Sequence, residues 1–208
     1  MVRIKIPSMK IAAVLVAESL DEEAIYREQR EGVAVAEIGR LLCINMQYRQ
    51  IISRDSLKRA VEEARKSNAI ILHLSCHGDA EGIQLTDGSE ITWSELAELT
   101  QPHATPARAL VVSACSGGVH GLTKHLGTGD LRPYGFIIGP SGNIALSDAC
   151  VAWCLFYRRL IHQGQRLTRD AILAAVKDIN SYLDVGVVSR RWDTNAGKYL
   201  KFEGKRSL

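Results

Sequence analysis

Short, continuous runs of apolar residues alternate along this chain with longer stretches whose apolar positions recur every three or four residues. Continuous apolar runs are typical of strands that are covered on both faces of a sheet. The longer stretches have the period of amphipathic helices. This alternation predicts an α/β fold with a largely parallel sheet between two helical layers. The predicted strands are 9–17, 47–53, 69–75, 107–113 and 134–139, and the predicted helices are 21–42, 53–66, 92–99, 147–162 and 168–182.

Local signals refine these boundaries. Ser53 or Asp55 is placed to cap the helix that follows it, and Thr92 and Glu95 have the spacing of a capping box. Just before Thr92, the segments IQL and EIT are separated by Thr-Asp-Gly-Ser, which predicts a small hairpin. No repeat or linker interrupts the pattern. We therefore expect one domain over residues 1–208, with a short basic tail from about residue 183.

Composition excludes several classes of protein. The 208 residues are 46% hydrophobic and 24% charged, as in soluble globular proteins whose core needs no disulfide bonds. A net charge of +3 is too small to predict nucleic-acid binding. No segment approaches the roughly 20 apolar residues that span a bilayer. The basic start and apolar run of the N-terminus are also features of a signal peptide, but the apolar run, 11–17, leads directly into acidic residues, which favours a buried strand.

The five cysteines indicate reduced thiols and a cytoplasmic protein. An odd number without a C-x-x-C pair argues against both a disulfide framework and a zinc ribbon. The cysteines are Cys43, Cys76, Cys115, Cys150 and Cys154.

Two reactive side chains lie just beyond predicted strands. His77 follows the strand 69–75, Cys115 follows the strand 107–113, and a glycine comes soon after each. Their separation, 115 − 77 = 38 residues, leaves room for a crossover between parallel neighbours. In open α/β sheets, ligands bind beyond the carboxyl ends of the strands. A thiol, an imidazole and flexible main-chain N–H groups are the parts that nucleophilic acyl transfer requires.

Other residues have structural interpretations. Cys76 should point to the opposite face of the sheet from His77 and pack in the core, whereas His73 should be an interior histidine on the same face as His77. His120 and His125 are five residues apart without an acidic cluster, so we expect no metal site. The segment Gly-Pro-Ser-Gly at 139–142 lacks the lysine of a phosphate-binding loop.

Three segments in order carry a family resemblance. They are IILHLSCHGDAEGIQLTDGSEITWSEL, ALVVSACSGG and YGFIIGPSGNIALSDACVAWCLFYRRLIHQGQRLTRDAILAAV. Over about residues 45–180, the chain resembles the caspase-like cysteine proteases, and specifically the CHAT branch related to caspases and separase. The resemblance implies a three-layer α/β/α sandwich around a mostly parallel sheet.

The resemblance also implies site roles. Cys115 would be the nucleophile and His77 the base or proton shuttle. The main-chain N–H groups of Gly78 and Cys115 would form the oxyanion hole, and an acyl-enzyme would be hydrolysed without any cofactor. Because members of this clan usually orient the histidine with a main-chain carbonyl, we assign no catalytic aspartate.

Substrate and partner follow from the same resemblance. Separase-like members cleave after a basic residue, and an acidic pocket would select it by charge pairing. Asp148 is the best-placed candidate and Asp79 the next, although Asp148 could equally cap its helix near Ser147. The partner would be a protein or peptide, such as a gasdermin-like pore-forming protein in bacterial antiviral defence or cell death. The alternative is a catalytically inactive scaffold for protein–protein assembly.

Overall fold

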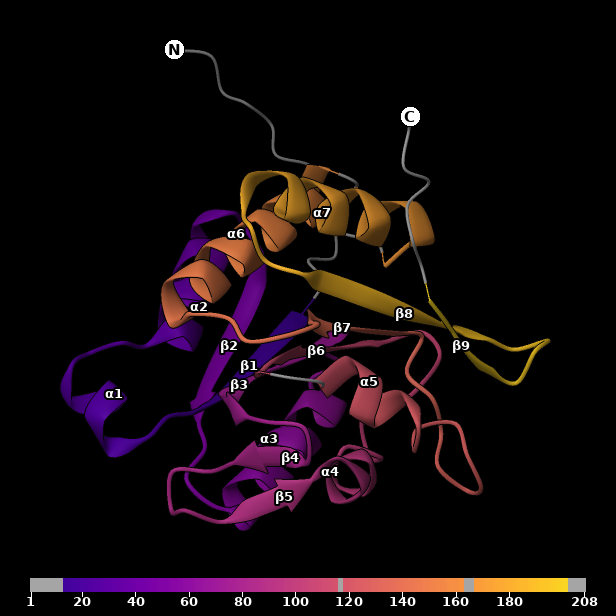
Figure 1. Ribbon diagram of the computed structural model, residues 1–208, viewed down its shortest axis with the longest axis horizontal. Coiled ribbons are helices and arrows are strands. Elements are labelled where there is room, and N and C mark those ends of the chain that lie inside the picture. The colour runs from indigo at the N-terminus through magenta and orange to yellow at the C-terminus, as the bar shows by residue number, and fades with distance from the viewer. Residues whose placement is uncertain (1–12, 116–117, 163–166, 202–208) are drawn as a thin grey trace.

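A central β-sheet lies between two layers of helices (Figure 1). The structure is a computed structural model that describes residues 13–115, 118–162 and 167–201. Its main sheet has the strand order β2-β1-β3-β6-β7-β8-β9. The first five strands are parallel to one another, β8 is antiparallel to β7, and β9 is antiparallel to β8. These strands are β1 (Ala13–Ser19), β2 (Asn45–Gln50), β3 (Ile71–Gly78), β6 (Ala109–Ser113), β7 (Phe136–Pro140), β8 (Val187–Asp193) and β9 (Lys198–Lys201).

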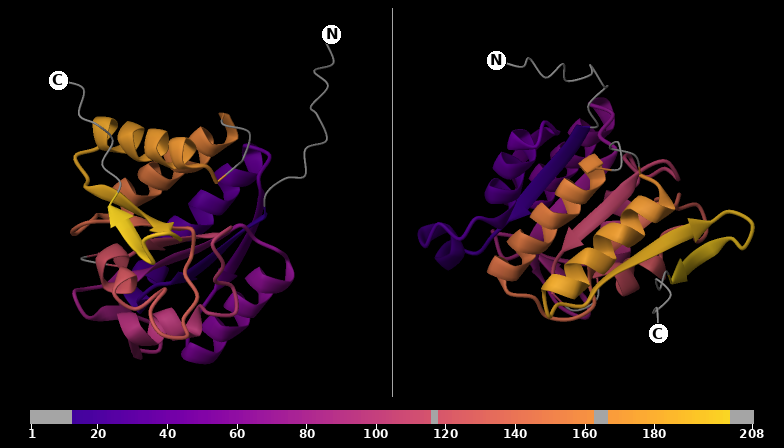
Figure 2. Two further views of the ribbon diagram at one scale, coloured as in Figure 1. Left: turned by 90° about the vertical axis from the view of Figure 1, so that its right-hand side faces the viewer. Right: turned by 90° about the horizontal axis from the view of Figure 1, so that it is seen from above.

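Helices cover both faces of this sheet, as Figures 1 and 2 show. One layer contains α2 (Glu31–Leu41), α6 (Leu146–His162) and α7 (Arg169–Tyr182). The other contains α3 (Arg54–Lys66), α4 (Trp93–Leu99) and α5 (Gly118–Thr123). A short helix, α1 (Glu22–Tyr26), follows β1.

Two hydrophobic clusters, one on each face, explain the continuous apolar runs. Every residue of β1 is buried. In β3, Leu72 and Leu74 pack into the cluster with α3 and α4, and Ile71 packs into the cluster with α6 and α7. Successive strand side chains point to opposite faces, so both sets must be apolar where helices cover both sides. The predicted fold class, an α/β sandwich around a mostly parallel sheet, is confirmed.

Two expectations about secondary structure are wrong. The stretch 21–42 forms two helices, α1 and α2, because the chain turns at Glu28, whose φ of 56° is incompatible with a continuous helix. The tail from about residue 183 contains β8 and β9. In their connection, Asp193 accepts the main-chain N–H groups of Asn195 and Ala196, and Gly197 has a φ of 60°.

Helix α5 was not predicted at all. Positions 9–12 of the first predicted strand lie outside the described residues. Within the described residues, no helix is long and apolar enough to cross a membrane.

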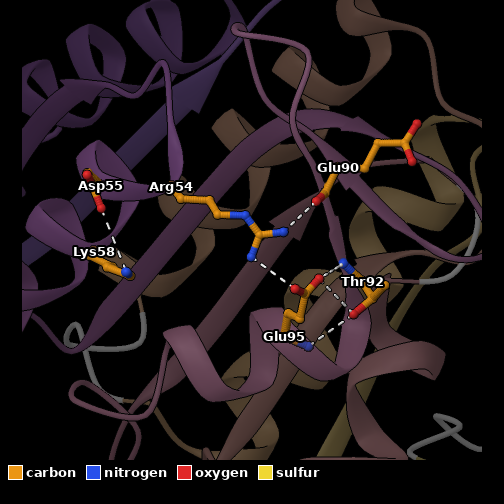
Figure 3. Close-up of polar contacts among 6 residues, drawn as sticks. All are labelled: Arg54, Asp55, Lys58, Glu90, Thr92 and Glu95. Atoms are coloured by element: carbon orange, nitrogen blue, oxygen red, sulfur yellow. Dashed lines mark hydrogen bonds and ion pairs between the residues drawn. The ribbon is translucent and has the colours of Figure 1, made fainter.

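The predicted hairpin is present as β4 (Gly82–Gln84) and β5 (Glu90–Thr92), and it extends the carboxyl end of β3. Figure 3 shows how it is held to helix α3. The Arg54 guanidinium donates to the Glu95 carboxylate at 3.0 Å and to the Glu90 carbonyl at 2.8 Å. The predicted capping box of Thr92 and Glu95 starts α4 directly after β5. The hairpin is therefore fixed on the side away from β3.

Candidate functional site

His77 and Cys115 lie at the carboxyl ends of two adjacent strands. Strands β3 and β6 are parallel, and their last paired residues are Ser75 and Ser113. His77 and Cys115 each come two residues after this pair, and adjacent strands are about 4.8 Å apart. Side chains two apart on a strand point to the same face. The register therefore puts His77 and Cys115 on neighbouring strand ends, and the alternation along β3 puts His77 on the face that α2 and α6 cover.

Gly78 allows the two strand ends to approach. A Cβ added at this glycine would lie 2.9 Å from the Cβ of Ala114 and 3.4 Å from the carbonyl oxygen of Cys115. Any other residue would thus collide with the segment that carries the thiol. Ser116 and Gly117, which complete the sequence motif after Cys115, lie outside the described residues.

The Cys115 thiol contacts the main chain of Ile144, between β7 and α6. The N–H of Ile144 donates to Sγ at 3.5 Å, and Sγ is 3.6 Å from the carbonyl oxygen of the same residue. A thiol can donate to the carbonyl, and a thiolate can accept the N–H. Both protonation states of Cys115 therefore have a polar partner.

A carboxylate that we did not expect faces His77. Nε2 of His77 is 3.1 Å from Oδ2 of Asp21, which follows β1. The other carboxylate oxygen of Asp21 accepts the N–H of Ala24 at 2.6 Å and caps α1. In the sequence, Asp21 follows the predicted strand 9–17 by four residues, and His77 and Cys115 each follow a predicted strand by two. That shared position was the available signal, but it identifies a neighbour of His77 only when β1 is known to pair with β3.

Cys76 and His73, which lie on β3 with His77, are both packed in the protein interior. Cys76 packs against the cluster with α3 and α4, and burial raises the pKa of its thiol. His73 is fully buried on the other face, with Nδ1 2.9 Å from the Tyr157 hydroxyl. Both agree with the expected alternation of side chains.

A buried polar cluster lies below the thiol on the same face. The Ser113 hydroxyl donates to Oε2 of Glu31 at 3.0 Å and accepts the Trp153 indole N–H at 2.7 Å. Oε1 of Glu31 is 3.6 Å from Nε2 of His73, and neither atom forms a hydrogen bond within the described part of the chain. The Glu31 side chain is only 1% exposed. One carboxylate oxygen is thus buried without a donor, which is energetically unfavourable.

The two predicted specificity residues occupy different surroundings. Asp148 is partly buried in the first turn of α6. Asp79 is exposed, and its Oδ1 accepts the N–H groups of Glu81 and Gly82 at 2.7 and 3.0 Å. Asp79 therefore shapes the turn into β4. A pocket of about 200 Å³ adjoins this turn, and His77, Gly78, Asp79, Glu81 and Glu90 are among its lining residues.

The sequence matches no protein-family model and no curated protein. The fold is similar to that of iotapain, a secreted C11 cysteine protease from Bacteroides thetaiotaomicron, with a TM-score of 0.54 and 6% identity. It is also similar to that of the Arg-specific cysteine proteinase gingipain R, with a TM-score of 0.52 and 11% identity. The matches cover 88% and 83% of this chain, which spans 67% of iotapain and 44% of gingipain R. At these identities the likeness shows a shared fold.

Proposed function

We propose that this chain is a cysteine endopeptidase in which Cys115 is the nucleophile and His77 transfers the proton. One observation carries the proposal. His77 and Cys115 lie at the carboxyl ends of adjacent parallel strands, and each is followed closely by a glycine. The fold in which they do so is similar to that of two cysteine proteases.

The chemistry follows from these groups. His77 takes the thiol proton, and the Cys115 thiolate attacks the peptide carbonyl carbon. Main-chain N–H groups of Gly78 and Cys115 stabilise the oxyanion. His77 then protonates the leaving amine, so that the C–N bond breaks and a thioester remains. A water molecule, deprotonated by His77, hydrolyses the thioester and restores the thiol.

Thiol labelling tests the proposal without knowledge of the substrate. We expect iodoacetamide to alkylate Cys115 faster than any other cysteine, and Cys115→Ala to remove the fast phase. Cys43 is the matched comparison because it is exposed and lies away from His77. Cys43→Ala should leave the fast phase intact. Equal labelling rates at Cys43 and Cys115 would contradict the proposal and favour the scaffold alternative.

We further propose cleavage after a basic residue. Asp148 and Asp79 remain the candidates, because Asp148 is only partly buried and Asp79 is exposed beside His77. A guanidinium or ammonium group of the substrate would pair with such a carboxylate. The Arg specificity printed for gingipain R belongs to that protein and only suggests the class of substrate.

Reporter peptides with Arg, Lys or Asp before the scissile bond test this specificity. The two variants Asp148→Asn and Asp79→Asn keep the side-chain shape and remove the charge. The pocket carboxylate is the one whose loss lowers Arg and Lys cleavage while the thermal midpoint stays near that of the wild type. Cleavage of the Asp peptide alone would overturn the acidic-pocket proposal.

For the biological role we propose cleavage of one partner protein in a bacterial antiviral defence or cell-death pathway, with a gasdermin-like protein as the first to test. This rests on the CHAT resemblance. Five free cysteines support a reducing, cytoplasmic environment. Incubating the protein with a purified gasdermin-like candidate would give one discrete Cys115-dependent fragment pair. An uncut candidate would exclude that substrate.

A further inference from the structure

We propose that Asp21 is a positioning residue, whose carboxylate holds the Nε2 edge of His77 so that Nδ1 serves Cys115. This inference rests on the proposed function and adds a third residue to the pair. It replaces the expectation that no aspartate takes part.

The strand order brings Asp21 to His77. Strand β1 is the parallel neighbour of β3, and their last paired residues are Ser19 and Cys76. Asp21 comes two residues after Ser19, and its Oδ2 is 3.1 Å from Nε2 of His77. The carboxylate thus approaches from β1, while β6 brings the thiol to the other side of β3. The strand that carries His77 thus lies between the strand that leads to Asp21 and the strand that leads to Cys115.

Asp21 is held in place by its surroundings. Oδ1 accepts the Ala24 N–H and caps α1, which leaves Oδ2 toward His77. The chain just before it is tied to the turn between β4 and β5. There the Thr86 N–H donates to the Ser19 hydroxyl at 2.9 Å, and the Thr86 hydroxyl donates to the Leu20 carbonyl at 2.7 Å. A carboxylate anchored on both sides can orient a ring as a mobile surface acid cannot.

The exposure of the ring assigns its two edges. The His77 side chain is 43% exposed, yet its Nε2 atom is buried. The exposed part therefore belongs to the other atoms of the side chain, and Nε2 is the nitrogen that Asp21 contacts. The Asp21 contact lacks an aligned hydrogen bond, and it becomes an ion pair when the imidazole is protonated. Such contacts often align only when substrate binds.

The carboxylate would act on the charge of the ring. When His77 takes the thiol proton, the imidazolium faces Asp21, and the ion pair favours the thiolate form of Cys115. Three further acids, Asp79, Glu81 and Glu90, line the pocket beside His77, and Cys76 adjoins it on β3. Asp21 is distinguished from them by its direct contact with a ring nitrogen. Because the Asp21 side chain is 52% exposed, solvent weakens the effect.

Asp21→Asn separates charge from structure, because asparagine caps helices as well as aspartate does. We expect a thermal midpoint close to that of the wild type, a kcat about 10-fold lower, and a KM that changes little. Iodoacetamide labelling of Cys115 should slow in parallel. Asp21→Glu, which keeps the charge, should recover part of the rate.

Two further variants make the outcome decisive. Asp21→Ser caps the helix but cannot reach His77, so it tests the same loss if the asparagine variant folds poorly. Asp55→Asn is the matched control, because it removes an acid that is 86% exposed at the start of α3 and should change nothing. Unchanged kcat and Cys115 labelling in folded Asp21→Asn would show that Asp21 only caps α1. Slow Cys115 labelling in the wild type would instead overturn the proposed function.

Discussion

Acidification should destabilise this protein through one interior histidine, His103. It is fully buried, and its Nε2–H donates to the Ala69 carbonyl at 2.8 Å. Burial removes His103 from water and lowers its pKa to about 4. The hydrogen bond to Ala69 partly opposes this decrease, and the charge of Arg108 adds a smaller decrease of its own. The unfolded chain therefore binds a proton at this histidine at a higher pH than the folded chain does.

The size of the effect follows from linkage. Because the folded pKa is about 4 and the unfolded value about 6.5, stability is constant above pH 6.5 and falls as pH decreases toward 4. At 1.36 kcal/mol per pH unit, this one group lowers the free energy of unfolding by about 3 kcal/mol at pH 4. That is a large part of the stability of a typical domain.

The assay is urea unfolding followed by tryptophan fluorescence between pH 4 and pH 8. His103→Gln removes the titrating group, so its free energy of unfolding should fall less on acidification than that of the wild type. The exposed His120 provides the control, and His120→Gln should follow the wild-type curve. Parallel curves for His103→Gln and the wild type would refute the assignment to His103.

Two further predictions concern the walls of the site. In Gly78→Ala, the new methyl group would meet the Gly82 carbonyl oxygen at 3.0 Å as well as Ala114, so we expect a cost of about 1–3 kcal/mol in unfolding and loss of peptidase activity. Gly142→Ala, where the space is open, should be silent in both assays, and equal melting of the two variants would contradict the steric argument. Arg54→Ala frees β5 from α3 and should raise KM about twofold to fivefold, because this hairpin lines the pocket beside His77. Lys58→Ala is the control for Arg54→Ala, because it loses only a contact with Asp55 on the same helix (Figure 3). An equal KM for the two variants would show that the contacts of Arg54 with the hairpin do not affect substrate binding.

Features with a local cause could be predicted from the sequence. The capping box of Thr92 and Glu95 and the hairpin before it involve residues close in the chain, and both form as expected. Glu28 shows the opposite case. Glutamate rarely adopts a positive φ, so the sequence does not predict one at this position. The stretch 21–42, whose pattern is that of one helix, therefore forms α1 and α2. Strands β8 and β9 were missed because their basic composition resembled a solvated tail.

The sequence by itself determined that this is an α/β protein and that His77 and Cys115 each follow a strand. Hydrophobic periodicity and turn residues act over a few positions of the chain, so their effects can be predicted from the sequence. Tertiary structure decided the order of the strands, which depends on packing between distant segments and has no local signature. That order placed β1 and β6 on either side of β3, which brought Asp21 to His77 and Glu31 to Ser113, 82 residues away in the chain.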